Sequence, residues 1–156
     1  AFSRLLKRAC WDYYEPRTTH DSSLSASVHS VVASDLGLRR KAYEYFRLTA
    51  STDLADPMGN TAEGLHAAAL GGTWQAAVRG FLGARSAGGA LRLTPRLPEH
   101  WRAVSLRLRH RGARFAIHAT RDETRVDKLG GKQPSIVRVG SEILRLPAGR
   151  ATTVAR

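Results

Sequence analysis

The amino-acid sequence predicts an α+β protein, with helices in the first half of the chain and a small antiparallel β-sandwich in the second. Between residues 24 and 82, apolar residues recur at helical spacing. The period changes at residues 86–89, and from residue 103 apolar and polar residues alternate as in half-buried strands. We therefore expect two parts, residues 1–85 and residues 86–156.

The first part begins with a short amphipathic turn or helix end at residues 2–9, and Pro16 disfavours helix at the residue before it. A polar loop follows, in which Asp21, Ser22 or Ser23 is expected to cap the next helix through a side-chain oxygen. Gly37 is expected to end that helix in a left-handed conformation. Its predicted apolar stripe is Leu24, Val28, Val31, Val32 and Leu36.

Two more helices are expected, at residues 38–54 and 61–82. The first of these has a stripe formed by Ala42, Phe46, Thr49, Ala50 and Leu54. Asn60 and Glu63 have the spacing of a capping box at the start of the second.

In the second part, the run AVSLRLRH at residues 103–110 and the run RFAIHA at residues 114–119 predict two strands joined by a turn at Arg111 and Gly112. Four later strands are expected, separated by Gly- and Pro-containing turns: residues 124–127, 135–139, 142–146 and 151–155. Strands about ten residues apart are typical of a small sandwich.

Composition narrows the function classes. The net charge of +12 is concentrated in residues 90–156, which carry fifteen Lys and Arg against five Asp and Glu, whereas residues 1–89 carry ten against eight. Of the 25 basic residues 21 are Arg, which favours a solvated sheet face and a coding bias over a nucleic-acid partner. No apolar run is long enough for a membrane span. Cys10 is the single cysteine, which favours a reducing cytoplasm.

Three motifs could do chemistry: YYEPRTTHDSSLS at residues 13–25, NTAEGLH at residues 60–66 and GGTW at residues 71–74. The first two are polar loops that bring hydroxyls, an imidazole and backbone N–H groups to the start of a helix, which is the arrangement that an oxyanion needs. The histidines show no spacing typical of metal ligands, so no metal is expected.

These motifs, in this order, resemble the end of the catalytic domain in glycoside hydrolase family 65, the family of maltose, trehalose and kojibiose phosphorylases and a few related hydrolases. The resemblance runs from about Phe2 to Arg109. It implies that the first part contains the last helices of an (α/α)6 toroid. It also implies an inverting phosphorylase in which inorganic phosphate, as co-substrate, attacks the anomeric carbon and yields β-glucose 1-phosphate. No other cofactor is expected.

The resemblance implies that His20, Ser22, Ser23 and His66 contact the phosphate. From the residues alone, the serines could be helix caps, His20 a loop histidine and His66 a core histidine. If the chain belongs to a trehalase-like hydrolase of the family, Glu15 or Glu63 could activate water. Their alternative roles are an ion pair of Glu15 with Arg17 and the capping box of Glu63.

The family's general acid, a glutamate, is expected in a part of the catalytic domain upstream of residue 1, so no catalytic residue is assigned with certainty. We therefore expect a C-terminal fragment that is inactive alone and that packs against the remainder of the catalytic domain. The expected partners are a disaccharide and phosphate, with a homodimer by analogy and neither nucleic acid nor membrane. A basic binding module is the alternative outside enzymes. The sequence does not identify the disaccharide.

Overall fold

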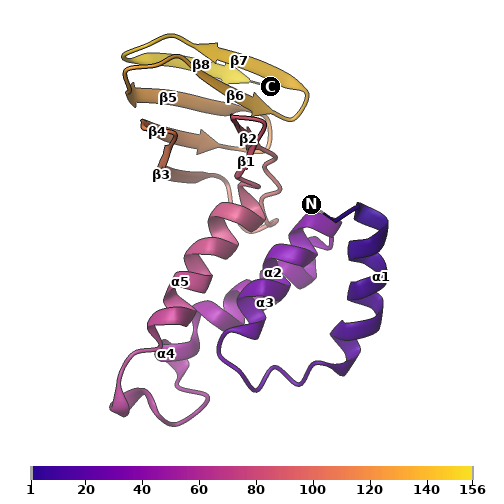
Figure 1. The fold of residues 1–156 in the computed structure, drawn as a ribbon. Coiled ribbons are helices and arrows are strands. Elements are labelled where there is room, and N and C mark those ends of the chain that lie inside the picture. The colour runs from indigo at the N-terminus through magenta and orange to yellow at the C-terminus, as the bar shows by residue number, and fades with distance from the viewer. Residues whose placement is uncertain (1, 156) are drawn as a thin grey trace. The chain divides into compact units, whose positions relative to one another are not determined.

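The computed structural model describes residues 2–155. The chain divides into two compact units, residues 1–81 and residues 82–156. Figure 1 shows helices in the first unit and strands in the second, which confirms the predicted fold class.

The helical unit contains α1 (Arg4–Tyr14), α2 (Ser25–Leu36), α3 (Arg39–Ala50), α4 (Thr52–Ala55) and α5 (Ala67–Gln75). Single 3₁₀ turns cover Glu15–Arg17 and Thr61–Glu63, and α5 continues into a π-helix at Ala76–Phe81. Gly37 ends α2 with φ 82°, as expected. The predicted helix over residues 38–54 is divided at Ser51, and the one over residues 61–82 begins six residues late, at Ala67.

The buried face of α2 is not the predicted apolar stripe. Apart from Leu36, the side chains that it buries are small, whereas Val28 is 61% exposed and Leu24 is 46% exposed. Ser30 donates to the carbonyl of Ala42, and Ser34 donates to the carbonyl of Gly80, so α2 packs through hydroxyls against α3 and the π-helix. Small side chains allow this close approach, and Leu24 and Val28 are left on the outside.

Two adjacent glycines of α5 test this close packing. A Cβ at Gly72 would lie 2.5 Å from Oγ of Ser27, whereas a Cβ at Gly71 would meet nothing within 4 Å. We expect Gly72→Ala to lower the free energy of unfolding by about 1–3 kcal/mol through overpacking. Gly71→Ala, the matched control, should raise it by up to about 1 kcal/mol through helix propensity. Urea unfolding of both variants measures the difference, and equal effects would contradict the packing described above.

The second unit contains eight strands: β1 (Arg85–Ala87), β2 (Ala90–Leu93), β3 (Val104–His110), β4 (Ala113–Ala119), β5 (Thr124–Gly130), β6 (Ser135–Val139), β7 (Glu142–Leu146) and β8 (Ala151–Ala155). They form two four-stranded sheets with the orders β1-β2-β6-β7 and β3-β4-β5-β8. The predicted β-sandwich is confirmed, with β1 and β2 as additions and with one parallel pair, β2 with β6.

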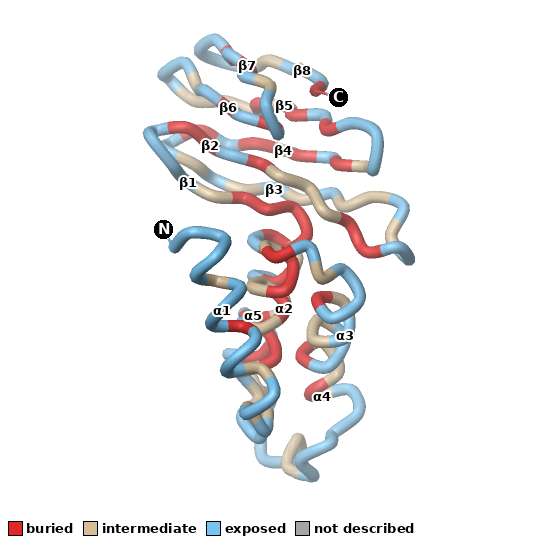
Figure 2. Tube along the Cα trace, turned by 90° about the vertical axis from the view of Figure 1, so that its right-hand side faces the viewer, coloured by how far each residue is buried: buried red, intermediate tan, exposed pale blue. Residues whose placement is uncertain are grey.

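Period-two alternation builds the core of this unit. Phe115, Ile117 and Ala119 of β4 are buried, as the alternation predicts, and the positions between them are more exposed (Figure 2). The same pattern along β5 buries Thr124, Val126 and then Lys128. A lysine therefore occupies a core position of the sandwich.

Candidate functional site

A pocket of about 310 Å³ lies beside the HDSS loop of the helical unit, residues 20–23. The loop residues His20, Asp21, Ser22 and Ser23 form one wall, with Ala26 from the first turn of α2. The rest of the lining comes from α3, α4 and the loop after them: Leu48, Thr49, Thr52, Pro57 and Met58. The structure thus brings three of the four predicted phosphate residues together, and His66 is not in the lining.

The two serine side chains do not cap α2 as the sequence suggested. The N-cap residue is Leu24, and the helix has no side-chain cap. The hydroxyl of Ser22 accepts a 3.3 Å hydrogen bond from Leu24 N–H, so its own proton is available for a ligand. Within residues 2–155, the hydroxyl of Ser23 makes no hydrogen bond. The wall therefore offers two hydroxyl donors beside a helix N-terminus whose first-turn N–H groups have no side-chain acceptor.

His20 is held in place by a chain of polar contacts. Its Nε2 lies 3.1 Å from the hydroxyl of Tyr45, and that hydroxyl donates a 2.9 Å hydrogen bond to Oε1 of Glu15. Its Nδ1 lies 2.9 Å from Oγ of Ser25. The backbone of His20 is in the left-handed region, with φ 60°. Glu15 also lies 3.5 Å from the ammonium group of Lys41. Both ring nitrogens thus have partners within the chain.

This chain of contacts selects one tautomer of His20. Because the Tyr45 proton is donated to Glu15, the tyrosine oxygen can only accept from His20, so Nε2 carries the ring proton. The Nδ1 atom then faces the hydroxyl of Ser25, whose one proton it shares with the carbonyl of Ser22 at 3.1 Å. Burial lowers the pKa of His20, and the neighbouring His29 lowers it further. Burial, together with the hydrogen bond to Glu15, raises the pKa of Tyr45 to about 12. His20 is therefore neutral at pH 7 and fixes the shape of the loop.

The lowered pKa of His20 predicts a pH dependence of stability. Because the pKa of the folded protein lies below the ordinary value of 6.5, the unfolded chain binds this proton more readily. The stabilisation is fully present above pH 6.5 and is lost as the pH falls through the lowered pKa. We expect His20→Gln to weaken the fall in unfolding free energy between pH 7 and pH 5, as measured by urea unfolding at each pH. An unchanged fall in that variant would contradict the account.

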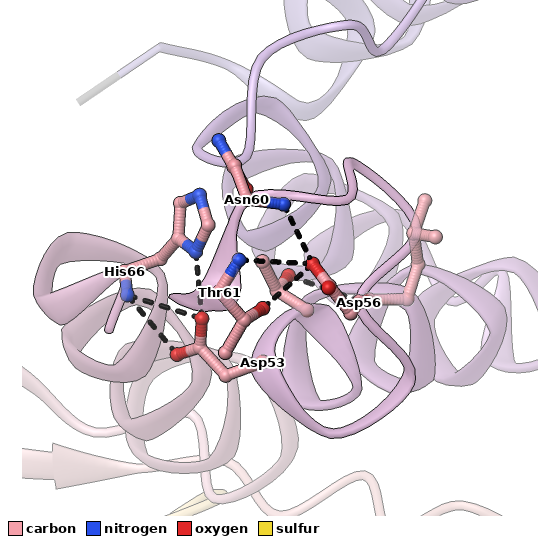
Figure 3. A network of polar contacts seen from close by, with 7 residues as sticks. Asp53, Asp56, Asn60, Thr61 and His66 are labelled. Atoms are coloured by element: carbon pink, nitrogen blue, oxygen red, sulfur yellow. Dashed lines mark hydrogen bonds and ion pairs between the residues drawn. The ribbon is translucent and has the colours of Figure 1, made fainter. Parts of the chain in front are cut away.

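His66 is fixed by a separate carboxylate. Its Nδ1 lies 2.6 Å from Oδ1 of Asp53, and its backbone N–H donates to both oxygens of that carboxylate at 3.1 Å (Figure 3). Hydrogen bonding by His66 lowers the pKa of Asp53, so this group is a carboxylate at neutral pH. His66 is also the N-cap residue of α5. The Nε2 atom is left for a ligand, since no described residue forms a hydrogen bond with it.

The predicted capping box between Asn60 and Glu63 is absent, because Asp56 takes the role. Oδ1 of Asp56 accepts from the backbone N–H groups of Asn60 and Thr61 and from the Thr61 hydroxyl (Figure 3). Asp56 adopts the left-handed conformation at φ 44°. This carboxylate ties the loop that precedes His66 back to the end of α4.

The two glutamates named as bases in the hydrolase alternative occupy different surroundings. The expected ion pair of Glu15 with Arg17 is wrong: Arg17 donates instead to the carbonyl of Tyr13, and Glu15 contacts Tyr45 and Lys41. Glu63 is exposed on a 3₁₀ turn. Neither glutamate lines the HDSS pocket.

Sequence reasoning missed the residues that hold the two histidines. Tyr45 and Asp53 lie in the region expected to be one helix, where their spacing gives no reason to single them out. The ring of His29, a residue that the sequence places only on a helix, packs 4.5 Å from that of His20, measured between centroids. The predicted antiparallel packing of the next helix against α2 could have indicated Tyr45, because this arrangement places Tyr45 opposite the HDSS loop.

Residues 2–155 contain no cluster of three or more His, Cys, Asp or Glu side chains suited to a metal ion. Cys10 is a free, exposed thiol. Over the same residues, no helix is long and apolar enough to cross a membrane.

The fold and site define a class: a helical unit with a polar-walled pocket at a helix N-terminus, followed in the chain by a β-sandwich. Residues 1–75 match the glycosyl hydrolase family 65 central catalytic domain, and residues 84–146 match the C-terminal domain of the same family. The chain belongs to glycosyl hydrolase family 65.

Three relatives illustrate the similarity. The chain is 41% identical to an alpha,alpha-trehalose phosphorylase of Thermoanaerobacter brockii, over 86% of this chain and 17% of the relative. It is 39% identical to a kojibiose phosphorylase of Caldanaerobacter subterraneus subsp. tengcongensis, over 93% and 19%. It is 42% identical to a maltose phosphorylase of Bacillus subtilis, over 77% and 16%. The chain thus spans less than a fifth of the length of these relatives.

A solved structure from the human microbiome, provisionally named a kojibiose phosphorylase, superposes on 99% of this chain and 23% of its own length. The TM-score is 0.88 and the sequence identity is 30%. The similarity includes the helical unit and the strands that follow it.

Proposed function

We propose that this chain provides the phosphate-binding part of an inverting disaccharide phosphorylase, which cleaves an α-glucoside of the maltose, trehalose or kojibiose type and releases β-glucose 1-phosphate. The observation that supports the proposal is the HDSS pocket. It lies in the region that matches the central catalytic domain, and its donors are two hydroxyls at the start of a helix. Three relatives over this region are named as phosphorylases of these disaccharides.

In the proposed reaction, phosphate is both the nucleophile and a ligand of this pocket. Ser22 and Ser23 donate their hydroxyl protons to phosphate oxygens, and the positive end of the α2 dipole favours the dianion. His20 shapes the loop in its neutral form, and His66, which Asp53 fixes and which lies outside the pocket lining of this chain, provides a third side-chain donor to phosphate. A carboxylic acid elsewhere in the catalytic domain protonates the departing sugar oxygen, and phosphate attacks the opposite face of the anomeric carbon.

The surroundings of the chain are part of the proposal. Several large apolar side chains of the helical unit are exposed: Leu54 is 88% exposed, Leu5 is 84% exposed and Trp74 is 57% exposed. We propose that the rest of an (α/α)6 toroid covers these side chains. In this proposal phosphate is a co-substrate, and the enzyme has no resident cofactor and is a homodimer. We place the enzyme in the cytoplasm, a reducing compartment in which a cysteine such as Cys10 stays unpaired.

Product analysis tests the proposal. The full-length enzyme that contains this chain is incubated with trehalose, kojibiose or maltose, with and without phosphate, and glucose 1-phosphate and free glucose are quantified. We expect glucose 1-phosphate, with its equivalent of glucose, only when phosphate is present. Release of glucose alone, independent of phosphate, would assign the protein to the hydrolases instead. Glu15 and Glu63 would then be the candidate bases that activate water.

A further inference from the structure

A second pocket, of about 640 Å³, lies within the β-sandwich unit, at the end where three loops meet. These are the β3–β4 turn, the β5–β6 loop and the β7–β8 loop. Gly149 N–H donates to the carbonyl of Gly131 at 3.0 Å, which ties the last two loops together. The lining also includes Arg111, Lys132 and Gln133. The volume lies within the range of small-molecule sites, about 300–1,000 Å³.

The charges around this pocket have one sign. Antiparallel pairing brings to this end of the unit five basic residues for which no described residue is a partner: Arg109, Arg111, Arg114, Lys132 and Arg150. Four of the five carboxylates in residues 82–155 lie in or next to loops other than the three that form this pocket: Glu99, Asp122, Glu123 and Glu142. The fifth, Asp127, accepts from Arg125 and Thr152.

A buried cation lies behind the pocket wall. Lys128 is 1% exposed and occupies a core position of β5. Its ammonium group donates to the carbonyls of Gln133 and Pro147, at 2.7 and 2.5 Å, so it joins the β5–β6 and β7–β8 loops. A Cβ at Gly131 would lie 3.4 Å from its Cε. Within residues 2–155 no carboxylate pairs with it, and a charge shielded from water projects a strong local field.

We propose that this pocket is a binding site for a phosphorylated small molecule, distinct from the HDSS pocket. Arg111 and Lys132 provide the donors to the phosphate group, and the uncompensated charge of Lys128 adds a favourable field. The apolar walls at Ala113 and Ala148 accommodate the organic part of the ligand. Nucleic acid fits less well, because the pocket lining contains no aromatic ring for a base to stack upon.

Titration calorimetry with glucose 6-phosphate and with inorganic phosphate tests the site. The protein carries Ser22→Ala and Ser23→Ala throughout, so that binding at the HDSS pocket does not contribute. Arg111→Asn with Lys132→Gln removes both donors. Asn is chosen because Arg111 has φ 48°, a conformation that Asn tolerates. We expect this pair of substitutions to weaken glucose 6-phosphate binding by at least about tenfold, because the charge-assisted hydrogen bonds from both side chains to the phosphate group are lost.

Two further variants make the result specific. Arg107→Ala with Arg138→Ala removes the same charge from exposed positions within β3 and β6, and should weaken binding less than about twofold at constant ionic strength. Lys128→Met, checked for folding by circular dichroism, should weaken binding without removing a pocket donor. Equal losses in the two arginine-containing pairs would overturn the proposal, as would undetectable binding of glucose 6-phosphate. Tighter binding of a single-stranded oligonucleotide at this end would also overturn it.

Discussion

Replacing Ser22 and Ser23 together with alanine should raise the KM for phosphate about a hundredfold, because two hydrogen bonds to a charged ligand are lost. Both serines line the HDSS pocket. The Ser22 proton is uncommitted, and the Ser23 hydroxyl has no partner among the described residues. Initial rates of glucose 1-phosphate formation by the full-length enzyme that contains this chain, at varied phosphate and saturating disaccharide, measure the change.

The control for this double variant is Thr19→Ala. Thr19 is an exposed hydroxyl residue of the same loop, lies next to His20 and is absent from the pocket lining. It should leave the KM for phosphate within about twofold of the parent value. A disaccharide KM that rises as steeply as the phosphate KM in the serine variant would show that the serines hold the sugar, which would contradict the proposed role.

The Asp53→Asn variant should lower the catalytic efficiency for phosphate roughly a hundredfold, because displacing a group that contacts the substrate by about 1 Å can lower the rate by that factor. Asp53 fixes His66 through three contacts of 2.6 to 3.1 Å, one to the ring and two to the backbone N–H. Asparagine preserves the size of the side chain and removes its charge, so the contact that orients the ring of His66 is weakened. Steady-state rates at varied phosphate measure the effect.

Asp56→Asn provides a matched control, because it is the same substitution in the neighbouring turn. The amide oxygen of asparagine can still accept from the backbone of Asn60 and Thr61, and asparagine tolerates the left-handed conformation at φ 44°. We expect an efficiency within about threefold of the parent. Equal losses in the two variants would mean that the whole loop, and not the Asp53–His66 contact, matters.

The sequence was informative where side chains alternate. The strands β3, β4, β6, β7 and β8 follow from period-two patterns and turn residues, because the inner face of a sandwich must be apolar. The short strands β1 and β2 carry too few residues for a period to show. β1 pairs with β2, and β2 in turn pairs with β6, more than forty residues later in the chain.

The helices were harder to predict, because hydrophobicity and burial diverge in this unit. On α2 the buried side chains are mostly Ser and Ala, and the apolar residues Leu24 and Val28 are exposed. A stripe of valine and leucine thus predicts the wrong buried face of a helix when that stripe is to be covered by another part of the protein. The late start of α5 has a local cause, since Asp53 and Asp56 hold the chain between Asn60 and His66 in a turn.

The candidate site was predictable in part. The HDSS loop could be recognised as a polar entry to a helix, and its predicted phosphate residues His20, Ser22 and Ser23 share one pocket. The contacts of His20 with Tyr45, and of His66 with Asp53, depend on tertiary structure that spacing alone does not give.

The most direct measurement is the position of phosphate in crystals of the protein grown without phosphate or sulfate and then soaked with phosphate. We predict a tetrahedral anion in the HDSS pocket, within hydrogen-bonding distance of the hydroxyls of Ser22 and Ser23 and of the first-turn N–H groups of α2. An HDSS pocket that stays without the anion, while phosphate is bound elsewhere in the catalytic domain, would contradict it.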